Sequence, residues 1–141
     1  MVKFEGVKFI NTVLINDVQR LIEKGFDYLS FVIIAQGIET IGSFFDDKPF
    51  DYYKQGLPKR RFLKGLELMG TKYTNIDNLL WTDLRCGLAH QLKPKGEITL
   101  TSYQSGGKDI VHLYKGNESG LTYIVVDTLF KDFKTACEKV I

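Results

Sequence analysis

Residues 27–45 read DYLSFVIIAQGIETIGSFF, the most apolar long stretch of the 141-residue chain. Large apolar residues recur in it every three or four positions, the spacing of one buried face of an α-helix. They are Phe31, Ile34, Ile38, Ile41 and Phe45. The most apolar part, residues 28–38, is about half the ~20 residues that cross a bilayer. We therefore expect the long, mostly buried helix of a soluble protein rather than a membrane span.

The residues on both sides of this stretch predict three more helices with the same spacing. One covers residues 7–24 and ends at Gly25, where a glycine suits a helix C-terminus. Another runs from Pro58 to about Met69, and the next covers residues 75–92 before Pro94. Four helices joined by short links are typical of an antiparallel bundle.

After Pro94 the apolar period changes from helical to alternating, which indicates strands. Strands are expected at 98–103, 110–114 and 121–126, with glycine turns between them. The expected fold class is therefore mostly α: an antiparallel four-helix bundle (about 7–92), then a small antiparallel β meander (about 97–126) and a C-terminal helix (about 127–140). We treat residues 1–141 as a single domain, because a chain of this length ordinarily builds one core.

Composition excludes several classes of protein. Apolar residues make up 44% of the chain and charged residues 26%, proportions that support a core and exclude intrinsic disorder. The net charge of +2 does not by itself indicate a nucleic-acid or membrane partner. Two cysteines, Cys86 and Cys137, are too few for a disulfide framework, and Glu5, Asn11 and Asp17 interrupt the apolar stretch that a secretory signal needs. We expect a cytoplasmic protein without a membrane partner.

Positive charge is nevertheless concentrated in residues 48–72, which carry a net charge of +5 and leave −3 for the rest of the chain. Lys59, Arg60 and Arg61 fall in the first turn of the helix expected from Pro58, where cations oppose the helix dipole, and Lys64 follows one turn later. These four cations are the candidate RNA-binding residues. With Tyr52, Tyr53 and Phe62 interleaved, the segment combines phosphate-binding groups with stacking surfaces, as single-stranded RNA binding requires. A run of charges is more often just a solvated face, and both interpretations stay open.

The helix expected at 75–92 contains the sequence DLRCGLAHQ at positions 83–91, in which four residues separate Arg85 from His90. This pair resembles the R-x4-6-H motif of the HEPN superfamily, over about residues 7–92. The resemblance implies a small helical domain, commonly a homodimer, that acts on RNA. Many members are metal-independent endoribonucleases of toxin, antiphage-defence and RNA-processing systems, so the resemblance implies a catalytic Arg85 and His90 with no metal and no cofactor. Cys86 departs from the polar residue that often follows the motif arginine.

The chemistry of the two side chains fits this implication. RNA cleavage needs a cation beside the scissile phosphate and a proton carrier for the ribose 2′-hydroxyl, and Arg85 and His90 match these tasks. On an ideal helix, at about 100° per residue, two side chains five positions apart point about 140° away from each other. A twofold dimer, or a loosening of the helix near residues 92–94, is therefore expected to unite them. Glu39, at the margin of an apolar helix, is expected to support the pair by orienting Arg85 or His90.

Other interpretations of these residues remain open. Arg85 can pair with Asp83 or Asp77 at the surface, and a histidine at a helix C-terminus interacts well with the dipole. The chain can also be a non-catalytic protein-interaction module, or the partner of a toxin or nucleotidyltransferase, with short exposed strands as its docking edge. Neither Cys86 as a nucleophile nor His112, which lacks a local partner, is favoured. No C-x2-C or H-x3-H spacing predicts a metal site.

Overall fold

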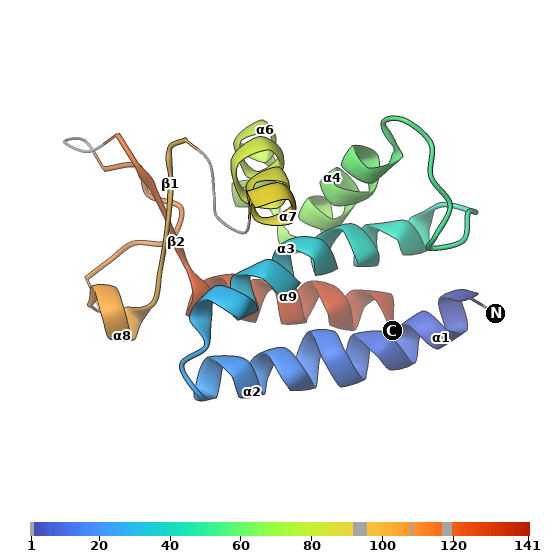
Figure 1. The fold of residues 1–141 in the computed structure, drawn as a ribbon, viewed down its shortest axis with the longest axis horizontal. Coiled ribbons are helices and arrows are strands. Elements are labelled where there is room, and N and C mark those ends of the chain that lie inside the picture. The colour runs from blue at the N-terminus through green and yellow to red at the C-terminus, as the bar shows by residue number, and fades with distance from the viewer. Residues whose placement is uncertain (1, 92–95, 108, 117–119) are drawn as a thin grey trace.

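The computed structural model describes residues 2–91, 96–107, 109–116 and 120–141, and side chains from Gly6 onwards within these ranges. The chain is mostly helical, with a small sheet near one end (Figure 1). The N-terminal helical segment, α1 (Val2–Phe9), η1 (Ile10–Asp17) and α2 (Val18–Glu23), is continuous, and η1 is wound as a π-helix. It begins before the expected position 7 and ends at Glu23, just before the expected stop at Gly25, whose φ of 83° explains the glycine there.

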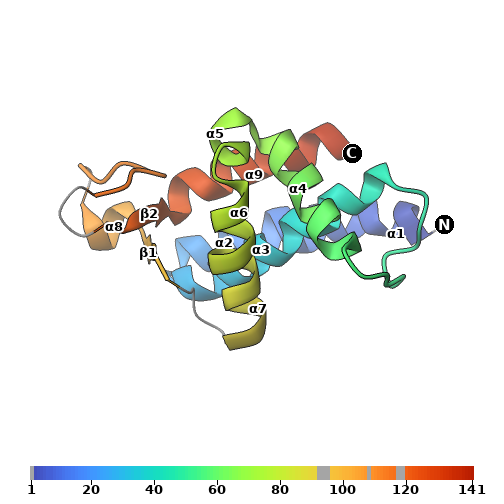
Figure 2. The same ribbon diagram turned by 90° about the horizontal axis from the view of Figure 1, so that it is seen from above.

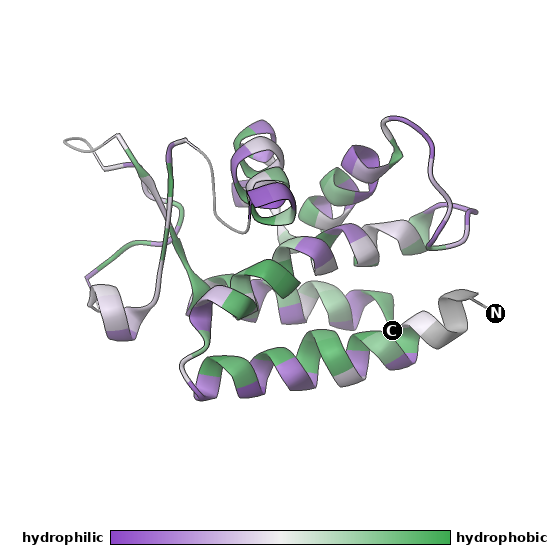
Figure 3. Cartoon of the chain, in the orientation of Figure 1, coloured by the Kyte–Doolittle hydropathy of each residue, from purple (hydrophilic) through white to green (hydrophobic). Residues whose placement is uncertain are grey.

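The apolar stretch forms the central helix, α3 (Asp27–Gly42), which continues into the short 3-10 turn η2 (Ser43–Phe45). Phe31, Ile34, Ile38 and Ile41 are almost fully buried, as expected, whereas Phe45 is half-exposed. By length and hydropathy, residues Asp27–Phe45 match a membrane span, but half of that window is buried within the protein. The green, apolar faces of the helices turn toward one another in Figure 3, which suits the core helix of a soluble protein.

Helix α4 (Leu57–Met69) packs directly on α3. Its contact is built on two glycines, because a Cβ on Gly42 would collide with the Arg61 carbonyl and a Cβ on Gly65 would collide with the Ile38 carbonyl. The two backbones can therefore approach more closely than larger residues would allow. This close approach fixes the start of α4 relative to the far end of α3.

The helix predicted at 75–92 forms as one continuous helical segment of α6 (Asp77–Leu79), η3 (Leu80–Cys86), again a π-helix, and α7 (Gly87–Gln91), while Leu92 lies outside the described residues. The short helix α5 (Thr71–Thr74) precedes it. The α6–α7 segment lies across α3 rather than alongside it (Figure 2). The up-and-down arrangement of an antiparallel four-helix bundle is therefore not what the described residues form.

The predicted three-stranded antiparallel meander is also wrong. Strands β1 (Ile98–Thr101) and β2 (Thr122–Val125) pair in parallel, with Ile98 opposite Thr122 and Thr101 opposite Val125. The short helix α8 (Tyr103–Gly106) replaces the expected tight turn, because Ser102 accepts a hydrogen bond from the Ser105 amide as its N-cap. Residues 113–116 do lie antiparallel to β2, through the bonds from Leu113 N to Tyr123 O and from Gly116 N to Leu121 O.

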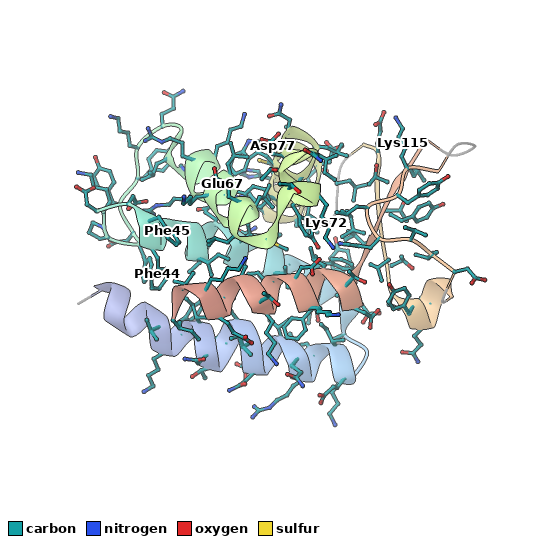
Figure 4. The ribbon with its side chains drawn as sticks, turned by 180° about the vertical axis from the view of Figure 1, so that it is seen from behind. Phe44, Phe45, Glu67, Lys72, Asp77 and Lys115 are labelled. Atoms are coloured by element: carbon teal, nitrogen blue, oxygen red, sulfur yellow. The ribbon has the colours of Figure 1, made fainter. Side chains whose placement is uncertain are left out.

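The last helix, α9 (Val126–Val140), starts one residue before the expected position. It packs against α3, α4 and η1, so it belongs to the central core (Figure 1). Leu129, Phe133, Ala136 and Cys137 share one buried cluster with Ile34, Ile38 and Leu66. Viewed from behind, α9 lies in front of α3 and between the N-terminal helices and α4 (Figure 4).

Candidate functional site

The predicted motif residues lie at a surface groove of about 520 Å³, which we call the Arg85 groove. Its walls come from α3, from the loop 46–56, from the start of α4 and from η3–α7. Figure 2 shows this loop and α7 projecting on the same side of α3. The polar and aromatic side chains that line it are Glu39, Asp51, Tyr52, Tyr53, Lys59, Arg61, Trp81, Arg85 and His90.

Arg85 is held in a defined position within this groove. Its Nε donates to Glu39 Oε1 at 2.9 Å, and its Nη2 lies 2.7 Å from the same oxygen. Its guanidinium also covers the face of Trp81, with 4.8 Å between Cζ and the ring centroid. Both charged side chains are largely buried, with exposed fractions of 15% for Arg85 and 23% for Glu39. Glu39 therefore contacts the motif helix, and the surface pairing of Arg85 with Asp83 or Asp77 does not form.

His90 is exposed and lines the same groove as Arg85 within one chain. One chain therefore brings both residues to one groove, although they point about 140° apart on an ideal helix, and a homodimer stays a prediction. The π-helix η3 ends at Cys86 and residues 87–90 are α-helical, so both side chains reach the groove because its walls extend over α3, the loop 46–56, α4 and η3–α7. The alternative loosening, at 92–94, lies outside the described residues. Within the described ranges, no hydrogen bond or ion pair is formed by the His90 ring.

Arg61 does not belong to an RNA-binding surface. Its side chain is only 6% exposed, and its Nε and Nη2 donate to the two carboxylate oxygens of Asp46 at 2.7 and 3.1 Å. Its Nη1 and Nη2 also donate to the carbonyls of Phe50 and Pro49, respectively. These four bonds hold the loop 46–56 against α4, which is a structural role.

The other candidate cations are divided between two sites. Lys59 lines the Arg85 groove, whereas Arg60 and Lys64 line a neighbouring hollow of about 470 Å³. Successive helical residues are rotated by about 100°, so adjacent cations necessarily point in different directions. Phe62, expected as a stacking surface, is fully buried against Trp81, with 5.6 Å between the ring centroids.

Aromatic side chains contribute more to the groove than sequence reasoning predicted. Trp81 was not among the predicted site residues, although it lies four positions before Arg85, a spacing that places two side chains on one helix face. Tyr53, with 73% of its surface exposed, stands at the opposite wall. Cys86 is a half-buried free thiol that also lines the groove.

A second polar cluster lies outside the groove and involves His112, for which no local partner was expected. Val125 N donates to His112 Nδ1 at 3.0 Å, so Nε2 carries the proton of the neutral ring and donates to Tyr73 Oη at 2.8 Å. Tyr73 in turn donates to Asp132 at 2.6 Å, and Lys72 pairs with the same oxygen at 2.8 Å. Figure 4 shows Lys72 beside α9. Val125 lies 13 residues from His112 and Tyr73 lies 39 residues from it, so no local pattern in the sequence reveals these partners.

Burial determines the protonation of this cluster. Desolvation, reinforced by the positive charge of Lys72, lowers the pKa of His112 to about 4. Desolvation and the bond to Asp132 raise the pKa of Tyr73 well above its ordinary value. Burial likewise raises the pKa of the Cys137 thiol to about 12, so this cysteine is an unreactive core residue.

Among the residues whose side chains are described, no three His, Cys, Asp or Glu side chains come together as potential metal ligands. The groove instead combines cations, an imidazole and aromatic surfaces with two carboxylates, Glu39, which pairs with Arg85, and Asp51. Comparison with known proteins adds no relative to this description, since no family model, no curated protein and no solved structure matches the chain.

Proposed function

We propose that this protein is an HEPN-like RNA-binding domain and a metal-independent endoribonuclease of a toxin or defence system, with the Arg85 groove as its active site. The observation that carries the proposal is that Arg85 and His90 line one groove together with Lys59 and exposed tyrosines. An RNA strand needs cations for its phosphates and aromatic faces for its bases, and this groove offers both.

The proposed reaction uses the ribose 2′-hydroxyl as its nucleophile. His90 accepts the proton of the 2′-hydroxyl while the 2′-oxygen attacks the adjacent phosphorus, and the bond from phosphorus to the 5′-oxygen breaks. The leaving 5′-oxygen takes a proton from solvent, so the products are a 2′,3′-cyclic phosphate and a 5′-hydroxyl. Arg85 stabilises the negative charge that develops on the phosphoryl oxygens.

Glu39 and Trp81 are assigned positioning roles in this proposal. Two contacts to one carboxylate oxygen and a stacked indole restrict the Arg85 side chain to one orientation before RNA arrives. Preorganisation of this kind lowers the entropy lost on binding. Glu39 also competes with phosphate for Arg85. The RNA phosphate must therefore bind the N–H groups of the guanidinium that Glu39 does not use.

A homodimer and a cytoplasmic location remain part of the proposal. The dimer is not needed to unite Arg85 with His90, because one chain brings both to the groove. A homodimer would instead present two Arg85 grooves in one assembly. Light scattering coupled to gel filtration measures this oligomeric state directly. The cytoplasm supplies RNA and keeps Cys86, a free thiol in the groove, reduced.

The test is cleavage of a labelled RNA in EDTA by the full chain and by His90→Ala. We expect metal-free cleavage by the native protein, with cyclic-phosphate ends, and a 10²–10⁴-fold slower rate for the variant because its proton carrier is missing. His90 is exposed, so the variant should fold normally. Gln91→Ala is the matched control, because Gln91 is also exposed on α7 but does not line the groove.

Two results would contradict catalysis at this site: loss of cleavage in EDTA, or full activity of His90→Ala. A 2′-O-methyl RNA must resist cleavage, since its 2′-oxygen has no proton to lose. If RNA binds without being cut, the domain is an RNA-binding module only.

A second candidate, a non-catalytic interaction module, is favoured by the segment that borders β2. Val111 exposes 59% of its surface and Tyr114 exposes 49%. The sheet strands β1 and β2 lie at the end of the molecule opposite to the N-terminus (Figure 1). Exposed apolar side chains beside a short sheet suit a protein partner. A partner captured by the native chain but not by Val111→Ser/Tyr114→Ser, together with no RNA cleavage, would favour this function instead.

A further inference from the structure

The hollow next to the groove, which we call the Arg60 hollow, has an unusual concentration of positive charge. Lys48, Arg60, Arg61 and Lys64 line it, against the carboxylates of Asp46 and Asp47. Arg61 neutralises Asp46 through their direct ion pair. Three cations and one exposed carboxylate therefore remain, which leaves the hollow with a net positive charge.

These cations are not explained by the stability of α4. Arg60 and Lys64 are four residues apart on one helix face, where like charges repel by about 0.2–0.5 kcal/mol. Arg60 also lies in the first turn of α4, which contains no acidic residue to balance the helix dipole. Such an arrangement costs stability unless an anion is bound.

The three cations differ in how firmly they are engaged. The Lys64 ammonium lies 3.2 Å from Glu67, with 42% and 59% of the two side chains exposed, so this pair is weak and readily exchanged. Lys48 and Lys64 rest over the rings of Tyr52 and Phe45, respectively. Arg60 is exposed, and its side chain forms no hydrogen bond or ion pair with any residue that the structure describes.

The Arg60 hollow adjoins the Arg85 groove, because Leu57 and Arg61 line both. Lys59 faces the groove and Arg60 faces the hollow, so consecutive residues of one helix turn serve the two sites. Buried Arg61 fixes the loop 46–56 against this turn. The relative position of the two sites is therefore rigid.

We propose that Lys48, Arg60 and Lys64 form a second phosphate-binding subsite, which holds a backbone phosphate of the same RNA strand whose cleaved linkage lies in the Arg85 groove. This inference rests on the proposed function, and it adds a requirement for length. An RNA long enough to reach both sites binds more tightly than one that fills only the groove, because the second contact is made within an already bound strand.

The experiment measures the affinity of fluorescein-labelled 2′-O-methyl oligouridine of two and of eight nucleotides by anisotropy, with the full-length protein. The native chain should bind the octanucleotide at least tenfold more tightly than the dinucleotide. Arg60→Ala should weaken octanucleotide binding at least fivefold and leave dinucleotide binding unchanged. Lys48→Ala should act in the same direction. The slope of log K against log salt should become shallower by about 0.7 for each phosphate that the variant no longer neutralises.

Arg20→Ala is the matched control, because Arg20 is an exposed arginine on α2 that lines neither the groove nor the hollow. It removes the same charge but should not alter the binding of either RNA. If Arg60→Ala and Arg20→Ala weaken octanucleotide binding equally, the effect is one of net charge and the subsite is refuted.

The remaining outcomes separate the two proposals. If Arg60→Ala leaves the binding of both RNAs unchanged, the second subsite is refuted, whereas the proposed active site in the Arg85 groove stands. Failure of the native chain to bind either RNA overturns the proposed function and the subsite together. If an octaglutamate peptide at equal concentration displaces the octanucleotide, the hollow is a binding site for an acidic peptide and the proposed phosphate-binding subsite is refuted.

Discussion

At the scale of single residues, the environment of a charge decides its role. Arg60 and Arg61 are neighbours of the same type, yet Arg60 is exposed at a basic hollow and Arg61 is buried with four hydrogen bonds to one loop. The two histidines differ in the same way. His90 is exposed at the groove, whereas His112 joins a network with Tyr73 and Asp132.

His112 makes the stability of the protein depend on pH. Its pKa is about 4 in the folded chain and about 6.5 when unfolded, so the unfolded state binds the proton more readily. Its contribution is fully present above pH 6.5 and is lost as the pH falls from 6.5 toward 4. We expect a loss of about 2–3 kcal/mol over this window, with some reduction from solvent screening. Urea unfolding at pH 7 and pH 4.5 measures it.

The matched variant for this effect is His112→Gln, which retains an amide to bond Tyr73 but does not titrate. It should be less stable than the native chain at pH 7 and should lose less stability on acidification. An unchanged pH dependence would mean that carboxylates account for all of it.

At the scale of elements, the close approach of α3 and α4 positions both sites. Gly42 and Gly65 allow the backbones of α3 and α4 to come into direct contact. This contact positions the first turn of α4, which contains Lys59 and Arg60, near Glu39 of α3. The continuous segment η3–α7 acts similarly, because it brings Trp81, Arg85 and His90 to one groove. Small changes in backbone packing thus determine which side chains meet.

Gly65→Ala tests this contact. Helix propensity alone would make alanine about 1 kcal/mol more stable than glycine in a helix interior. We expect the opposite sign, a loss of about 1–3 kcal/mol, because the added methyl group collides with the Ile38 carbonyl. Thermal and urea unfolding measure the change. A stabilised variant would show that the helices can separate at no cost, and the positions of Lys59 and Arg60 would then not be rigid.

At the scale of the whole molecule, the C-terminal third is part of the core and not an appendage. Helix α9 buries Leu129, Phe133 and Ala136 against α3, α4 and the N-terminal helices. Beyond it, the network of His112, Tyr73 and Asp132 joins the segment before β2 to α5 and α9. The helical segment at 7–92 that carries the HEPN resemblance is therefore incomplete without residues 96–141.

A chain of residues 1–96 should consequently fail to fold. It would expose the apolar surface of α3 and α4 that Phe133 and Leu129 cover, and each large side chain removed from a core costs about 3–5 kcal/mol. We expect reduced helicity by circular dichroism and no cooperative thermal transition, in contrast to the full chain. A cooperative transition in the shortened chain would show that the bundle is an independent unit.

The sequence by itself determined where the helices form, because apolar spacing and helix-ending glycines are local signals: the helix from Asp27, the helix at Leu57–Met69 and the C-terminal helix all lie where they were predicted. It also indicated the site residues Glu39, Lys59, Arg85 and His90, which share one groove. Only the tertiary structure decided the parallel pairing of β1 and β2, the burial of Arg61 and Phe62, and the role of Trp81. The strand pairing and the burial depend on contacts between residues far apart in the chain, about which a local pattern carries no information. Trp81 does share a local spacing with Arg85, but the groove that both line is formed only when the loop 46–56 and α4 pack beside them.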